Sequence, residues 1–250
     1  MGNKLAATSR CGHLVNFLIF VRDFLDKERN EEPPVIQKYE INKLINDLSN
    51  TDDRDSVHIE FEGITFKVRA SNMNPKPHLM NKTMDVILSM KYDWLKDGRI
   101  REEKTEEERK KDSIEIYDCN IEIRATDDNG QRVSFSWHLD CEEEINGKFV
   151  HPRFHFHAGG RKISGLDTGQ LLMISSPRIA YPPMDLPLAI NFIIRNFIHK
   201  NDMEDQYNIL THKQYTIPVK NSIVDILKPY FNEVHTKVDT NQSYYFPILL

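Results

Sequence analysis

One short segment concentrates the side chains that could do chemistry. Residues 151–162 contain three histidines, His151, His155 and His157, together with several basic residues. Imidazole changes its charge near neutral pH and can serve as a general acid, a general base or a metal ligand. The segment therefore predicts either a site for a phosphate-bearing substrate or a metal site.

Strand periodicity sorts these side chains onto two faces. If residues 150–157 form a strand, successive side chains lie on opposite sides of the sheet. The histidines and one arginine then share a face and can bind, while the proline and the aromatic residues pack: His151, Arg153, His155 and His157 against Pro152, Phe154 and Phe156.

The phosphate interpretation assigns a role to each part of this face. Histidines would transfer protons, and basic side chains with the glycine pair would neutralise and approach a phosphate. We expect a protein that binds RNA, or cleaves it without a metal ion, through His155, His157 and His138 as catalytic groups and His151, Arg153, Arg161, Lys162, Gly159 and Gly160 as substrate-binding groups.

A metal site is the alternative for the same residues. His155 and His157 could ligate one ion, and neutral imidazole suits zinc, nickel or iron. His138 and Asp140 on the preceding strand share this face only if the turn sets a compatible register. Because no HExxH or cysteine cluster supports a metal, the sequence favours phosphate, and we expect neither metal nor other cofactor.

Other catalytic classes match poorly. One class of metal-dependent nuclease uses an acidic residue and then a Glu-x-Lys motif. Here Arg124 stands at the lysine position after Glu122, and Thr65 stands at the glutamate position before Lys67. GxSxG is absent, and the tripeptide that begins at Asp167 occurs once, whereas an aspartic protease needs two.

The composition limits the cellular compartment and the binding partners that we expect for this protein. A net charge of −5 argues against a general nucleic-acid coat and leaves room for a local basic site. Cys11, Cys119 and Cys141 are odd in number and form no CxxC pair, which favours a reducing cytoplasm. The apolar run 14–21 is shorter than the roughly 20 residues that span a bilayer, so we expect no membrane anchor.

Hydrophobic patterns predict an α+β fold. It consists of an antiparallel β-meander over about residues 114–157, an N-terminal β-hairpin, and helices packed on one face. The Asn-Gly pair at 129–130 predicts a tight turn between strands 114–125 and 132–141. The other expected elements are helices at 41–48, 80–95 and 188–198, a hairpin of 57–61 with 64–68, a strand at 149–157, and a helix or buried strand at 14–25.

The chain is long enough for one or two domains. We expect a single domain over residues 1–250, which the charged segment 99–112 could divide into 1–98 and 113–250. The apolar C-terminal residues, from Tyr244 to Leu250, must dock somewhere. The alternative function is therefore a non-catalytic interaction module, or a subunit of a protein complex, that uses this C-terminus.

Overall fold

We describe the protein from a computed structural model. It describes residues 10–26, 36–51, 56–69, 79, 83–99, 112–141, 154–159, 179–180, 183–198 and 207–227. The α-helices are α1 (Arg10–Leu25), α2 (Lys38–Ser49), α3 (Leu186–Phe197) and α4 (Lys213–Ser222), with a 3₁₀ turn η6 (Tyr207–Thr211) and a π-helical turn η7 (Ile223–Leu227). The strands are β1 (Ser56–Arg69), β2 (Thr83–Arg99), β3 (Asp112–Thr126), β4 (Arg132–Cys141), β5 (Phe154–Ala158) and β6 (Ile179–Ala180).

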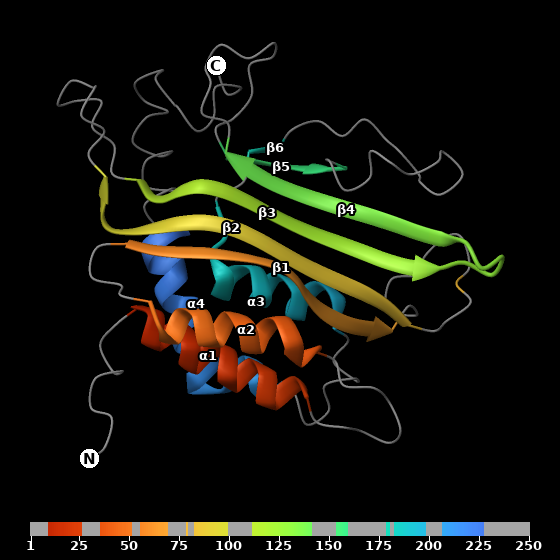
Figure 1. The fold of residues 1–250 in the computed structure, drawn as a ribbon, viewed down its shortest axis with the longest axis horizontal. Coiled ribbons are helices and arrows are strands. Elements are labelled where there is room, and N and C mark those ends of the chain that lie inside the picture. Colours follow the sequence, from red (N-terminus) through yellow and green to blue (C-terminus); the bar gives the residue numbers. More distant parts are fainter. Residues whose placement is uncertain are drawn as a thin grey trace, which may run out of the picture.

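The strands form one antiparallel sheet in sequence order. Each strand pairs with the next along the chain, from β1 to β6. The four α-helices lie on one side of this sheet (Figure 1). The predicted α+β meander with helices on one face is therefore confirmed.

The core lies between the sheet and the helices. Helix α2 buries Ile41, Leu44, Ile45 and Leu48, whose spacing places them on one side of the helix. Helix α3 is apolar nearly all round, and its Phe197 packs against Trp137 of β4 and its Phe192 against Phe156 of β5. Among the described residues, no helix is both long and apolar enough to cross a bilayer.

The predicted hairpin of residues 57–61 with 64–68 is wrong. Residues 57–61 and 64–68 belong to the single strand β1, which pairs with β2 along its length. Gly63, with φ +88°, lies at an irregularity in this pairing. The glycine therefore interrupts the alternation without reversing the chain, because a left-handed residue can form a bulge as well as a turn.

The predicted helix over residues 80–95 is wrong, because residues 83–95 belong to strand β2. Every second residue from Met84 to Tyr92 is buried, which is the period of a strand with one covered face. Apolar residues at positions 84, 87 and 88 fit a helical period equally well. Pairing with β1 on one side and β3 on the other decides between the two.

The predicted hairpin of β3 and β4 is confirmed. The Asp127 carboxylate accepts hydrogen bonds from the backbone N–H groups of Asn129 and Gln131, at 2.9 and 2.7 Å. Gly130 has φ +78°, a conformation that glycine adopts without strain. The turn therefore fixes the register of the two strands.

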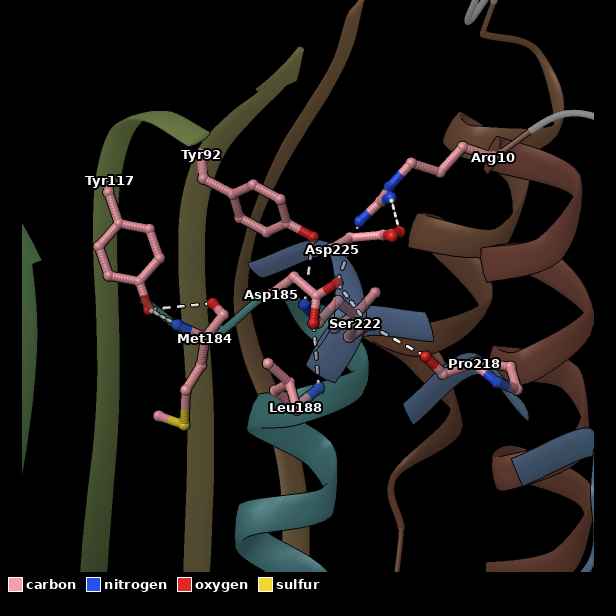
Figure 2. A network of polar contacts seen from close by, with 10 residues as sticks. Arg10, Tyr92, Tyr117, Met184, Asp185, Leu188, Pro218, Ser222 and Asp225 are labelled. Atoms are coloured by element: carbon pink, nitrogen blue, oxygen red, sulfur yellow. Dashed lines mark hydrogen bonds and ion pairs between the residues drawn. The ribbon is translucent and has the colours of Figure 1, made fainter. Parts of the chain in front are cut away.

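A buried network joins the sheet to the start of α3 (Figure 2). The Tyr117 hydroxyl donates to the Met184 carbonyl at 3.0 Å and accepts from the Met184 N–H at 2.9 Å. The Tyr92 hydroxyl accepts from the Leu186 N–H at 3.1 Å. Tyr92 thus satisfies a backbone N–H that the helix start leaves without a partner, and Tyr117 satisfies both backbone groups of the residue before the N-cap.

Asp185 is the N-cap of α3. Its Oδ1 accepts from the Leu188 N–H at 3.2 Å, and Pro187 lies in the first turn. Its Oδ2 accepts from Arg10 at 3.1 Å and from the Ser222 hydroxyl at 2.6 Å (Figure 2). Asp185 thereby ties α1, α3 and α4 together.

The remaining predictions fall partly outside the described residues. Segment 14–25 is the helix α1, and the strand predicted at 149–157 is described from Phe154 onward. Residues on both sides of the charged segment 99–112 belong to neighbouring strands of one sheet, β2 and β3. The C-terminal residues 244–250 lie outside the described residues.

Candidate functional site

Strand register brings three histidines together on one face of the sheet. His138 on β4 pairs with His157 on β5, and Asp140 pairs with His155. On the other side of β4, Asn120 of β3 pairs with His138. Side chains opposite each other on neighbouring strands lie on the same face, so these residues form a cluster.

Asp140 is the centre of this histidine cluster, which we define as His138, Asp140, His155 and His157. Its Oδ2 lies 2.8 Å from His138 Nε2 and 4.0 Å from His157 Nε2. Its Oδ1 lies 2.8 Å from His155 Nε2. One carboxylate therefore faces all three rings.

A second layer of contacts fixes the orientation of His138. Its Nδ1 lies 2.7 Å from Asn120 Oδ1. The amide nitrogen of Asn120 donates in turn to Asp118 Oδ1. Asp118 therefore sets which end of the Asn120 amide faces the imidazole.

Burial differs among the members of the cluster. The side chain of His155 is 0% exposed, whereas His138, His157 and Asp140 are 13%, 16% and 30% exposed. Solvent or substrate can therefore reach His138, His157 and Asp140, but it cannot reach the buried His155. His155 is thus placed to act through Asp140.

The cluster shifts the proton affinities of its members. Burial opposes ionisation of Asp140, but hydrogen bonds from His138 and His155 outweigh it and hold the pKa of this carboxyl well below its usual range. Burial, and then the charge of His138, lower the pKa of His157. Asp140 is therefore ionised and His157 neutral at neutral pH.

Three members of the cluster could hold a metal ion. One ligand atom each from His138, Asp140 and His157 lie within 4.8 Å of one another. Two imidazoles and one carboxylate are a ligand set that zinc and iron sites use. Within the described ranges, no other group of three such side chains meets this distance.

Of the predicted site residues, the structure describes Gly159 and the three histidines of the cluster, His138, His155 and His157. Gly159 has φ +111°, and its N–H donates to the Ser136 carbonyl at 2.8 Å, so it ends the pairing of β5 with β4. The other predicted substrate-binding residues lie outside the described residues: His151, Arg153, Gly160, Arg161 and Lys162.

Asn120 is a member of the site that the sequence reasoning missed. The signal that could have found it is the turn at 127–130. Thr126 pairs with Arg132 beside this turn, and counting back along both strands from that pair places Asn120 opposite His138. A predicted turn type fixes the register, and the register identifies the partners.

The carboxylate of Glu122 has a different set of partners on the same sheet. It forms a two-pronged ion pair with Arg124 at 2.6 and 2.7 Å and accepts from the Ser134 hydroxyl at 3.0 Å. Burial opposes its ionisation, but these bonds lower the pKa of Glu122 below its usual value. This carboxylate is occupied by structural contacts.

The cysteine at the centre of the sheet is also structural. Cys119 is buried, and its burial raises the pKa of the thiol to about 12. A thiol that stays protonated is a poor nucleophile and a poor metal ligand. Cys119 acts as a small core residue.

Comparison with known proteins gave no match: no family model, no curated protein and no solved structure is similar to this chain.

Proposed function

We propose that the histidine cluster binds a phosphate-bearing substrate, and that this substrate is RNA. The observation that carries the proposal is the pairing of two partly exposed imidazoles, His138 and His157, whose ring centres lie 5.1 Å apart. Such a pair can act on one substrate group, and Asn120 and Asp140 hold the His138 ring in place. The cytoplasm is the proposed location.

His157 is the group that we assign to proton transfer. It is partly exposed, and its lowered pKa leaves the imidazole neutral and able to accept a proton. In RNA that proton comes from the 2′-hydroxyl, whose oxygen attacks the adjacent phosphorus while the bond to the 5′-oxygen breaks. The leaving oxygen takes a proton from water, and the products are a cyclic phosphate and a 5′-hydroxyl.

The buried His155 is a positioning residue in this proposal. It contacts Asp140 at 2.8 Å and has no exposed surface through which to touch a substrate. The neighbouring basic residues Arg153, Arg161 and Lys162 support the proposal through the sequence alone. Their positive charge, close in sequence to His155 and His157, suits a phosphate.

The test is cleavage of a labelled single-stranded RNA of mixed sequence by the full chain, with DNA of the same sequence as a comparison. We expect His157→Ala to lower the RNA cleavage rate by about 100-fold or more, the usual range for loss of a proton-transfer group. DNA should stay intact, because it lacks the 2′-hydroxyl.

The matched control is His58→Ala. His58 also lies on a strand and contacts two carboxylates, those of Asp93 and Glu60, but it is exposed and belongs to β1. This variant should cleave RNA like the unmodified protein. Equal rates for His157→Ala and His58→Ala, or no RNA cleavage and no RNA binding by the unmodified protein, would overturn the proposal.

A further inference from the structure

Both ring nitrogens of His138 face hydrogen-bond acceptors, although a neutral imidazole carries only one N–H. The Asn120 amide nitrogen donates to Asp118, so its carbonyl oxygen is the atom 2.7 Å from His138 Nδ1. A carbonyl oxygen only accepts, so Nδ1 carries a proton. In a neutral ring, Nε2 then has a lone pair and no proton.

This lone pair faces a second acceptor. Asp140 Oδ2, a carboxylate oxygen, lies 2.8 Å from His138 Nε2. Two acceptors at this separation need a positive charge between them. Either a second proton on His138 or a metal ion supplies that charge.

The position of His157 favours a metal ion over a proton. His157 Nε2 lies 4.0 Å from the same Asp140 Oδ2, and the three ligand atoms lie within 4.8 Å of one another. A proton is shared between two atoms, whereas a metal ion collects three or more. The third nitrogen beside this pair completes a set of three possible metal ligands.

The distances suit a small transition-metal ion. Metal–ligand distances of about 2.0–2.2 Å in a tetrahedral site place neighbouring ligand atoms roughly 3.4 Å apart. The separations of 2.8 and 4.0 Å between Asp140 Oδ2 and the two imidazoles lie on either side of this value. Both separations thus lie within about 0.6 Å of the spacing in a tetrahedral site.

The surrounding contacts are those that metal ligands usually have. A ligating histidine commonly donates its other N–H to a carbonyl or carboxylate, and a ligating carboxylate is itself hydrogen-bonded. Here His138 contacts Asn120, Asp140 contacts the buried His155, and His157 has a hydrogen bond with the backbone of Ala158. Each of the three candidate ligands thus has a partner that orients it.

We infer that His138, Asp140 and His157 form a binding site for a divalent first-row transition-metal ion of the zinc type, with His155 and Asn120 holding the ligands. Three protein ligands leave a coordination position open for water or a substrate oxygen. The inference deepens the proposed function and rests on it for the substrate class alone: the open position would take a phosphate oxygen, whose charge the ion would neutralise. With the ion bound, the Nε2 lone pair of His157 would be on the metal, so this ring would accept the 2′-hydroxyl proton only in the metal-free protein.

Metal binding is tested on the full chain without RNA. After treatment with a chelator, Zn²⁺, Co²⁺ and Mg²⁺ are titrated separately in a calorimeter. We expect one Zn²⁺ or Co²⁺ to bind per chain and Mg²⁺ not to bind, because Mg²⁺ prefers oxygen ligands. Absence of Zn²⁺ and Co²⁺ binding by the unmodified protein would overturn the inference.

Variants then show whether the ion binds at this cluster. Asn120→Ala should weaken Zn²⁺ binding by about 10–100-fold, as loss of an outer contact does, and His157→Ala and Asp140→Asn should weaken it more. His58→Ala should bind Zn²⁺ like the unmodified protein. Unchanged affinity in both His157→Ala and Asp140→Asn would contradict the assignment.

A spectroscopic measurement covers the case in which a variant fails to fold. In unmodified protein labelled with ¹⁵N-histidine, Zn²⁺ should shift the Nε2 signals of His138 and His157 and leave those of His58 in place. Unshifted signals for His138 and His157 would overturn the inference.

The inference and the proposed function can fail separately. RNA cleavage that persists in chelator, by a protein that binds no Zn²⁺, would remove the metal site and keep the function. One Zn²⁺ bound at the cluster by a protein that neither binds nor cleaves RNA would keep the metal site and remove the function.

Discussion

Asp140 and His155 lie opposite each other on β4 and β5, and the buried His155 ring contacts the carboxylate at 2.8 Å although no part of that ring is exposed. A buried polar side chain with such a partner contributes to stability as well as to a site. The two roles can be separated by mutation.

His155→Ala should lower the free energy of unfolding by about 2–4 kcal/mol, because it removes a buried ring and leaves a cavity and a carboxylate with one contact fewer. Urea unfolding followed by circular dichroism measures the loss. His58→Ala, at an exposed position, should change stability by about 0.5 kcal/mol or less. A His155→Ala protein as stable as the unmodified one would show that the contact with Asp140 is weak.

The pKa of His58 should lie above its ordinary value of 6.5. A hydrogen bond to Asp93 has the largest effect, burial opposes it, and Glu60 adds to it. Because the folded-state pKa exceeds the unfolded one, the protonated ring favours the fold. This stabilisation is complete below pH 6.5 and is lost as the pH rises through the folded-state pKa.

A titration of the His58 ring by NMR measures this pKa directly. In Asp93→Asn, the carboxylate that raises the pKa is gone, so the value should fall toward 6.5. A pKa of His58 at or below 6.5 in the unmodified protein would contradict the contact with Asp93.

Replacing Asp185 should test the link between α3 and the other helices. Asp185→Ala removes the N-cap and the partner of Arg10 and should cost about 2–4 kcal/mol. Asp185→Asn should cost less, since asparagine also caps helices and burial already raises the pKa of this carboxyl. Thermal unfolding of both variants ranks them, and an equal loss would contradict the capping role.

Ile116 is a position where the backbone is strained. It has φ +47°, which is unfavourable for a branched side chain, and it is 55% exposed, so little packing offsets the strain. Ile116→Asn should raise the free energy of unfolding by about 1 kcal/mol, because asparagine tolerates this conformation better. Chemical denaturation checks this, and a destabilised variant would indicate that the Ile116 side chain packs.

The turn and the strands beside it were predictable because their signals are local. The Asn-Gly pair requires a backbone conformation that few residues adopt, and the alternation in β3 and β4 fits one structure only. Residues 80–95 were mispredicted because their apolar positions fit two periods. The neighbouring strands β1 and β3, which lie elsewhere in the sequence, made this segment a strand.

The sequence by itself determined that His155 and His157 share a face, because a strand alternates its side chains with a period of two. It also offered His138 as their neighbour. Only the tertiary structure decided that all three rings meet at the carboxylate of Asp140, that Asn120 orients one of them, and that His155 is buried. The physical reason is that pairing between strands and the covering of a face depend on distant parts of the chain, which set the register and the burial that local periodicity leaves open.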